Sequence, residues 1–407
     1  MKYDLVFEGG GAKGMVLVGA YEEFVRQGHT HGRLLGTSAG AITAALVAAG
    51  YTPDEMLVAL NERENDRPVF AEFLEEPAPF TLDEIRTSAI RTFLRNIDIK
   101  LIPDFIEERF DSLIAQTLAQ NLSSRHVFAF VERGGWYAAD RFVTWLQTRL
   151  DSGQWQGKQR QFSKMTLSEF FDVTQVDLSV VVSDTTDSHL RVLNHNTAPD
   201  CPLVRAVRMS MSIPIIWEEV IWQADWGTYQ GRDLTGHVIV DGGLLSNFPL
   251  ELFISDAPEV TQLMGPKQDT RVLGLLIDDS LPVPPLAARG LFVDITVKPA
   301  ELRTVQRLKR LIDTATTAHD KMVIDAFSQL VVRLPAQGYG TTEFDMSDER
   351  RAALVQAGRS AMQHYFDNQP AAMETTRGIV APRGIEATEM AHALEAADRI
   401  ALRLLDQ

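Results

Sequence analysis

The chain has 407 residues, 45% of them hydrophobic, so it is long and apolar enough to bury a large core. Cys201 is its one cysteine, which excludes an internal disulfide framework and a cysteine-based zinc site; we expect a cytoplasmic location. The formal net charge of −16 disfavours nucleic acid as a partner, because phosphate contacts need clustered lysine and arginine. The chain start lacks an apolar signal core, and no run approaches about 18 uninterrupted apolar residues, so we expect neither a secretory leader nor a spanning helix.

The first fifty residues repeat one pattern, a short apolar strand, a glycine-containing turn and an apolar helix. The strands are "YDLVF" and "RLLG", and the two helices end at Gly28 and Gly50. Two such units in succession predict a parallel sheet covered by helices. A third helix is expected to begin at Thr52, which forms a capping box with Glu55.

Residues 62–130 are predicted to be a helical insertion, with a second capping box from Thr81 to Glu84. Inside it, "DEIRTSAIRTFLRNIDIK" has the pattern of a basic amphipathic helix. Such a helix either packs on the main domain with a solvated face or docks on a bilayer. Its basic residues are Arg86, Arg91, Arg95 and Lys100, and its apolar residues are Ile85, Ile90, Phe93, Leu94 and Ile97.

Three later runs, "DLSVVVSD", "HVIVDGG" and "RVLGLLIDD", predict buried strands of a sheet covered on both faces. Helical spacing dominates from about residue 299, and "NQPAAMETTRGIVAPRG" is expected to be a loop before an amphipathic helix at 385–405. One segment between these strands is rich in aromatic side chains, which either pack in the core or meet a lipid surface. They are Trp217, Trp222, Trp226 and Tyr229.

The stretch "VFEGGGAKGM" fits two templates. Gly9, Gly11 and Gly14 have the spacing of a dinucleotide-binding turn, whereas three glycines followed by Lys13 suit a set of backbone amides around an oxyanion. Dinucleotide binding requires an acidic residue about 20 positions further on, and "QGHTHGRLLGTS" contains none. A phosphate-binding P-loop is excluded too, because Lys13 is followed by Gly14 rather than by serine or threonine.

Two further motifs carry groups suited to catalysis. Ser38 stands between Gly36 and Gly40 at a strand-to-helix turn, the pattern of a nucleophile elbow, although an ordinary turn has the same composition. Asp241 ends an apolar strand, and two glycines follow it, Gly242 and Gly243; alone, this pair indicates a turn. No histidine stands in an obvious catalytic context: His29, His31, His126, His189, His195, His237, His319, His364 and His392.

In this order, "GGGAKG", "GTSAG" and "DGG" resemble the motifs of the patatin-like phospholipase family. Four further segments are similar to the family: "GGWYAADRFVTWL", "LSVVVSDTTD", "AVRMSMSIPIIWEEV" and "LLSNFPLELF". The resemblance implies an α/β fold, a three-layer α/β/α sandwich around a mostly parallel sheet. It assigns residues 1–365 to an acyl hydrolase domain with the insertion at 62–130, and leaves 366–407 as a linker and C-terminal amphipathic helix.

The resemblance also implies a mechanism without metal or cofactor. Ser38 attacks an ester carbonyl, Asp241 takes its proton, and the N–H groups of Gly10 and Gly11 hold the oxyanion. Burial should raise the pKa of such an aspartate toward the working pH. Lys13 adds positive charge nearby, and the whole oxyanion loop comprises Gly9, Gly10, Gly11, Lys13 and Gly14.

By the same resemblance the substrate is a phospholipid or another acyl lipid, reached by peripheral contact with a membrane. Enzymes of this kind include membrane-degrading effectors that a small molecule or a partner protein activates. The alternative is a catalytically silent lipid-binding or interaction protein with the same fold. The complete set of Ser38, Asp241 and glycines counts against silence, because an idle site has no physical need for all of them. The sequence fixes no oligomeric state.

Overall fold

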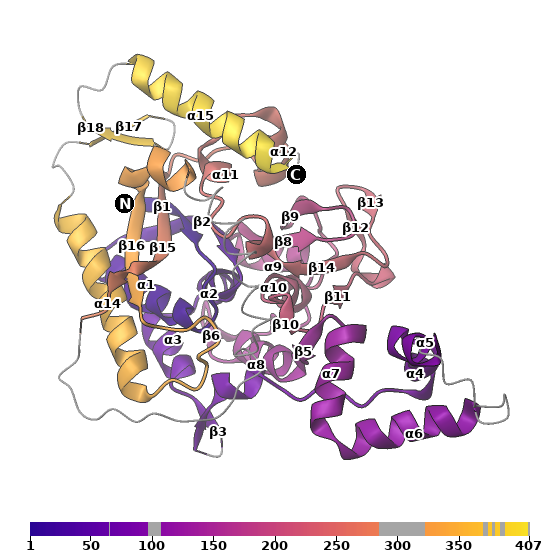
Figure 1. Cartoon of the computed structure of the whole chain (residues 1–407). Coiled ribbons are helices and arrows are strands. Elements are labelled where there is room, and N and C mark those ends of the chain that lie inside the picture. The colour runs from indigo at the N-terminus through magenta and orange to yellow at the C-terminus, as the bar shows by residue number, and fades with distance from the viewer. Residues whose placement is uncertain are drawn as a thin grey trace.

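The computed structural model describes residues 1–64, 66–96, 107–284, 322–368, 373–376, 379–382 and 387–405. Within them the chain folds around an eight-stranded sheet with the path β11-β14-β8-β2-β1-β15-β16, and β9 pairs with β8 beside this path (Figure 1). The five neighbours from β8 to β16 are mutually parallel, whereas β9, β11 and β14 pair in the antiparallel sense. The expected mostly parallel sheet is confirmed.

The strands of this sheet are β1 (Lys2–Phe7), β2 (Thr30–Thr37), β8 (Leu178–Asp184), β9 (His189–Leu193), β11 (Val220–Ile221), β14 (Val238–Asp241), β15 (Arg271–Pro282) and β16 (Val331–Gln337). Two successive strand-turn-helix units open the chain, as the sequence predicts, because α1 (Met15–Arg26) follows β1 and α2 (Ala39–Ala48) follows β2. Crossovers between parallel strands are right-handed as a rule, so α1 and α2 are expected on one face of the sheet, where they contact each other.

Helices cover both faces. α14 (Asp348–Asp367) packs on α1, and α10 (Leu203–Ser210) packs on α2 and β8, which completes one layer. α11 (Glu251–Ile254), α12 (Pro258–Met264) and α15 (Ala387–Leu405) form the layer on the other side of the sheet (Figure 1). α15 is the expected C-terminal amphipathic helix, and its buried residues Ala397, Ala401 and Leu404 join the main hydrophobic core.

The helical insertion has a small core of its own. α4 (Leu82–Thr87), α5 (Ala89–Asn96), α6 (Glu107–Gln120) and α7 (Leu122–Glu132) surround Ile85, Leu118 and Phe128 and extend to one side of the sandwich (Figure 1). The chain from residue 62 to about 75 belongs instead to the main core, which includes Phe70 and Phe73. The separately packed helices therefore start near residue 80, later than the predicted 62.

The expected basic amphipathic helix is two short helices, because Ser88 has an extended backbone and its hydroxyl accepts a hydrogen bond from the Arg91 amide at 3.0 Å. Arg86 and Arg91 both approach the buried carboxylate of Asp111, at 3.6 and 2.5 Å, so much of their charge is compensated inside the insertion. Ile97 and Lys100 lie outside the described residues.

Two further expectations need correction, and one alternative left open by the sequence is decided. β16 interrupts the helical region expected after residue 299, and the expected loop contains the antiparallel pair β17 (Met373–Thr376) and β18 (Ile379–Pro382). The aromatic side chains expected either in the core or at a lipid surface are all buried, with 1 to 8% of their surface exposed: Trp217, Trp222, Trp226 and Tyr229. No helix in the described ranges combines the length and the apolarity needed to cross a membrane.

The remaining elements are short: η1 (Gly11–Gly14), α3 (Pro53–Leu60), β3 (Arg63–Glu64), β4 (Arg67–Pro68), η2 (Val69–Phe73), β5 (Gly135–Tyr137), α8 (Asp140–Asp151), β6 (Gln154–Trp155), β7 (Lys158–Gln159), α9 (Leu167–Thr174), β10 (Ile215–Trp217), η4 (Ala224–Trp226), β12 (Thr228–Tyr229), β13 (Arg232–Asp233), η5 (Gly242–Leu244) and η7 (Ser328–Leu330). Both predicted capping boxes are present, at the start of α3 and of α4.

Candidate active site

Ser38 occupies a sharp turn between β2 and α2. Its backbone has φ 54° and ψ −122°, a strained conformation for a residue with a side chain. Two glycines make the turn possible: a Cβ on Gly36 would lie 2.4 Å from the Gly40 carbonyl oxygen, and one on Gly40 would lie 2.1 Å from the Phe7 carbonyl oxygen. The turn therefore has the geometry of a nucleophile elbow.

The end of α10 holds this elbow in place. The Ser38 amide donates to Ser210 Oγ at 2.9 Å, and the Ser210 hydroxyl donates onward to the Val181 carbonyl at 2.6 Å. Two residues later, the Ser212 carbonyl accepts from the Asp241 amide at 3.0 Å. One short segment thus ties the serine turn to the aspartate strand.

Asp241 lies at the level of Ser38 in the sheet. It pairs with Val182 of β8, whose neighbour Val181 pairs with Thr37 of β2, the residue before Ser38. The carboxyl group is buried, and burial raises its pKa from 3.8 to about 7, against the lowering effects of the Ser38 hydroxyl and the Gly243 amide. Its Oδ1 accepts from that amide at 2.8 Å, while Oδ2 has no partner with full hydrogen-bond geometry in the described chain.

The glycine-rich turn after β1 leaves two amides uncommitted. The amides of Gly9, Ala12 and Lys13 donate to backbone carbonyls, whereas those of Gly10 and Gly11 donate to no group within the described ranges. Gly11 has φ +55°, which a side chain would strain. A Cβ on Gly9 would lie 2.9 Å from Ser38 Cβ, so this turn sits directly against the elbow.

Lys13 forms an ion pair with the neighbouring strand β15. Its Nζ donates to both carboxylate oxygens of Asp279 in β15, at 2.8 and 2.7 Å, and the lysine side chain is largely buried. The carboxylate compensates the ammonium charge. The geometry therefore suits an anchor for the glycine turn better than the expected additional charge beside an oxyanion.

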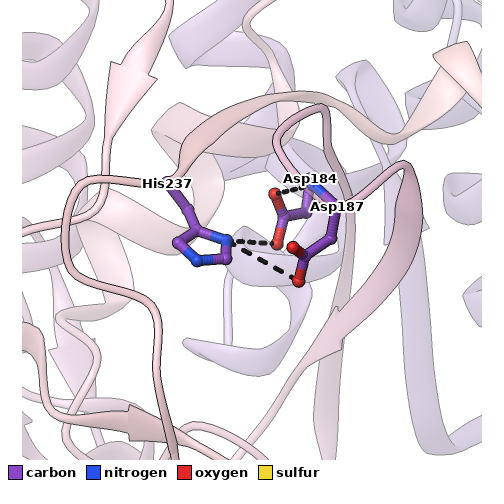
Figure 2. A group of neighbouring side chains, drawn as sticks. All are labelled: Asp184, Asp187 and His237. Atoms are coloured by element: carbon purple, nitrogen blue, oxygen red, sulfur yellow. Dashed lines mark hydrogen bonds and ion pairs between the residues drawn. The ribbon is translucent and has the colours of Figure 1, made fainter.

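The described histidines do not complete a triad, since none of them hydrogen-bonds to Ser38 or Asp241; His319 lies outside the described residues. His237 has another role at the opposite end of β14 from Asp241. Figure 2 shows its ring against Asp184 and Asp187, with Nδ1 at 2.9 and 3.8 Å from their carboxylate oxygens.

The Asp184, Asp187 and His237 side chains are close enough together to be considered as metal ligands. Arginines already occupy the carboxylates, however. Arg191 reaches Asp184 at 3.3 Å and Asp187 at 2.8 Å, and Arg232 reaches Asp187 at 2.8 Å. A cation would have to displace two guanidinium groups, so the cluster is accounted for as an ion-pair network.

The sequence model of the patatin-like phospholipases matches residues 5–254, which include Ser38, Asp241 and the glycine turn. The chain belongs to the patatin-like phospholipase family. Family membership supports lipid ester hydrolysis as its general activity. Uncharacterized protein YqhO of Bacillus subtilis is 26% identical over 375 residues, which are 90% of this chain and 98% of that protein. Probable lipid hydrolase 463L of Invertebrate iridescent virus 6 is 20% identical over 251 residues, 61% of this chain and 62% of that protein.

Solved structures with some likeness to this patatin-like chain come from larger proteins. VipD from Legionella pneumophila matches with a TM-score of 0.43 and 16% identity, over 90% of this chain and 66% of VipD. The type III effector protein ExoU matches with a TM-score of 0.36 and 18% identity, over 90% of this chain and 53% of ExoU. The chain thus spans about two thirds of one neighbour and about half of the other.

Sequence reasoning placed Ser38, Asp241 and the glycine turn together by resemblance, and the structure has them adjacent. The sequence analysis did not identify two residues that contact the site, Ser210 and Asn247. Ser210 lies in the segment "AVRMSMSIP", where a serine at a helix end gives no signal of a distant backbone donor. Asn247 follows the Asp-Gly-Gly turn by a few residues and donates to the Gly9 carbonyl at 2.8 Å and to Glu8 Oε1 at 3.1 Å.

Proposed function

We propose that this patatin-like protein is a phospholipase A-type lipid acyl hydrolase with Ser38 as nucleophile and Asp241 as general base. The observation that carries the proposal is the buried carboxyl of Asp241 at the level of Ser38, with its pKa raised to about 7. A carboxylate at its ordinary pKa is too weak a base to activate a hydroxyl, whereas one that titrates near neutral pH is suited to the task.

The reaction follows from this arrangement. Ser38 Oγ adds to the ester carbonyl carbon as its proton passes to Asp241 Oδ2, and the carbonyl oxygen becomes an oxyanion. Collapse of the tetrahedral intermediate breaks the ester bond, and the departing alcohol takes the proton from Asp241. Water then repeats the sequence on the acyl-serine, with Asp241 again as base, and releases the fatty acid.

The amides of Gly10 and Gly11, which donate to no described group, supply the oxyanion site. Loss of one donor from such a site typically costs on the order of 3 kcal/mol of transition-state stabilisation. Gly9, Gly14 and the Lys13–Asp279 pair hold the turn that presents them, and Gly36, Gly40, Gly242 and Gly243 shape the two turns that carry Ser38 and Asp241. We therefore assign no metal or cofactor to the reaction.

Contact with the membrane is proposed through the insertion. Phe93 of α5 is 63% exposed, and Val127 and Val131, one turn apart on α7, are each 49% exposed. Apolar side chains of this kind can enter the interfacial region of a bilayer even when the average surface is acidic. We propose a hydrolase domain at 1–365 and a C-terminal segment at 366–407 whose helix α15 packs into the core of that domain. We also propose that a partner protein or a small molecule activates the enzyme.

The test is hydrolysis of p-nitrophenyl octanoate by the full chain. We expect release of p-nitrophenol, and a loss of at least a thousandfold in both Ser38→Ala and Asp241→Asn. Ser168→Ala, at the first turn of α9, is the matched control and should keep full activity. A folded native protein that binds lipid vesicles without releasing p-nitrophenol would favour the silent lipid-binding protein instead.

A further inference from the structure

A narrow cavity, lined almost entirely by apolar side chains, runs from Ser38 into the helical layer. Along α2 the cavity is lined by Ala39, Ile42, Thr43 and Leu46. Ile42 and Thr43 follow Ala39 by three and four residues and precede Leu46 by four and three, so all four lie on one helix face. Met15 and Val18 of α1 line it as well.

Hydrocarbon is the ligand chemistry that the cavity fits, because its polar side chains other than Ser38 are already satisfied. The Thr43 hydroxyl donates to the Ala39 carbonyl at 3.0 Å. The indole N–H of Trp217 donates to the Phe73 carbonyl at 2.9 Å, and that of Trp145 donates to Glu62 Oε2 at 3.1 Å. No charged side chain lines the cavity among the described residues.

α3 and an aromatic cluster line the end of the cavity beside Leu46, which is called its closed end below. α3 begins five residues after α2 ends, so its buried residues Met56, Ala59 and Leu60 meet the cavity beside Leu46. The rings of Phe70, Phe73 and Trp145 contact one another, with centroids 5.0 to 5.4 Å apart, and line the adjoining wall.

The distance from the nucleophile to this wall sets a length. Leu46 stands eight residues after Ser38 on α2, which corresponds to about 12 Å of helix. An extended hydrocarbon advances about 1.3 Å per carbon, as expected from carbon–carbon bonds of about 1.5 Å. An acyl chain of about eight to ten carbons, with the ester carbonyl carbon counted as the first, therefore spans this distance.

We propose that this cavity is the acyl-chain site and that Leu46 and Ala59 at its closed end set the preferred chain length at about eight to ten carbons. The proposal rests on the hydrolase function above and adds the substrate class, medium-chain acyl esters. Each methylene buried in the cavity should raise kcat/KM about fourfold, until the closed end is reached.

The first test measures kcat/KM on p-nitrophenyl esters from acetyl to hexadecanoyl. For the native protein, kcat/KM should rise with chain length and level off at eight to ten carbons. Ala59→Phe fills the closed end, so kcat/KM on octanoyl and decanoyl esters should fall at least tenfold. On acetyl and butyryl esters kcat/KM should stay within about twofold of the native value. Val58→Phe is the matched control, because Val58 is on the same helix but 66% exposed, and its profile should equal the native one.

The second variant enlarges the cavity, so the test does not depend on whether Ala59→Phe folds. Leu46→Ala should move the plateau to chains two or three carbons longer. A uniform fall over all chain lengths in folded Ala59→Phe, together with an unmoved plateau in Leu46→Ala, would overturn the proposal.

A binding measurement separates this proposal from the hydrolase function. Ser38→Ala protein titrated with octanoate in a calorimeter should bind it, and adding Ala59→Phe should weaken binding at least tenfold. Binding of this kind without Ser38-dependent turnover in the native protein would leave the chain site standing and refute the hydrolase. Turnover without octanoate binding, and with no change of profile in either variant, would refute the chain site alone.

Discussion

Asp241 is the residue on which the chemistry turns. Its carboxyl group is buried between β8 and the serine turn, and burial is the dominant effect that raises its pKa to about 7. The same burial that makes the carboxylate a useful base makes its ionisation unfavourable. Function and stability therefore oppose each other at this position.

This opposition predicts a pH-dependent gain of stability in Asp241→Asn. The folded state binds the Asp241 proton more tightly than the unfolded state, so the native protein loses stability as pH rises from about 4 through about 7. The full loss corresponds to at most about 4 kcal/mol. Urea unfolding should show the variant more stable than native protein at pH 8, with the advantage gone near pH 4. The exposed Asp225→Asn is the control, and a constant difference across pH would contradict the assignment.

Ser210 is proposed to affect catalysis by positioning Ser38. Its hydroxyl oxygen is the acceptor for the buried Ser38 amide, so Ser210→Ala leaves that amide without a partner. We expect kcat to fall about tenfold or more with KM little changed, because a lost buried hydrogen bond costs about 1 to 3 kcal/mol. Ser179→Ala is the control: Ser179 Oγ accepts from the Asn194 side chain at 3.0 Å in the same sheet, away from Ser38. An equal fall of kcat in both variants would reduce Ser210 to a general stabilising role.

At the level of elements, the insertion shows how Ser88 divides an expected amphipathic helix into two helices. The periodicity around residues 83–100 favoured one basic amphipathic helix, but Ser88 ends α4 and caps α5, and the buried Asp111 draws Arg86 and Arg91 toward α6. A serine in a charged run is a weak signal for a break, and Asp111 is too far along the chain for helix spacing to reveal.

The Arg91–Asp111 pair is predicted to hold the insertion together. Arg91→Ala leaves the buried Asp111 carboxylate with Arg86 as its only cation among the described residues, a change that typically costs about 3 kcal/mol. Amide hydrogen exchange in α4 to α6 should speed up in Arg91→Ala and recover in part when Asp111→Ala is added. Arg67→Ala, at an exposed pair whose charged atoms are 4.0 Å apart, should change little. Additive effects of the two changes would exclude a direct coupling.

The elements that sequence patterns predicted well are those whose signals are local. The opening strand-turn-helix units and the capping boxes of α3 and α4 appear as expected, because apolar runs, glycines and capping residues act over a few positions. β16 was missed because its partner, β15, is distant in the sequence. The β17–β18 hairpin is local, but the prolines and glycines in and around it favour a loop. Sequence patterns also do not distinguish buried tryptophans such as Trp222 and Trp226 from tryptophans at a lipid surface.

At the scale of the whole molecule, the sandwich brings together three turns that are up to about 230 residues apart in the chain. The parallel order of β15, β1, β2 and β8 places the glycine turn and Ser38 at neighbouring strand ends. β14 runs the opposite way, and its register brings Asp241 to the same level. The order of the motifs indicated that these residues belong to one site. The pairing of Asp241 with Val182 and the hydrogen bond from the Ser38 amide to Ser210 could be seen only in the folded structure.

The most direct test of the account is the reaction of the full chain with an octyl fluorophosphonate, followed by mass spectrometry of the peptides. This reagent forms a stable bond only with a serine whose hydroxyl is activated. We predict one adduct per molecule, on Ser38, with a labelling rate that rises as pH passes through about 7 and is nearly abolished in Asp241→Asn. An adduct that persists in Ser38→Ala, or that forms mainly on Ser210 or Ser212, would contradict it.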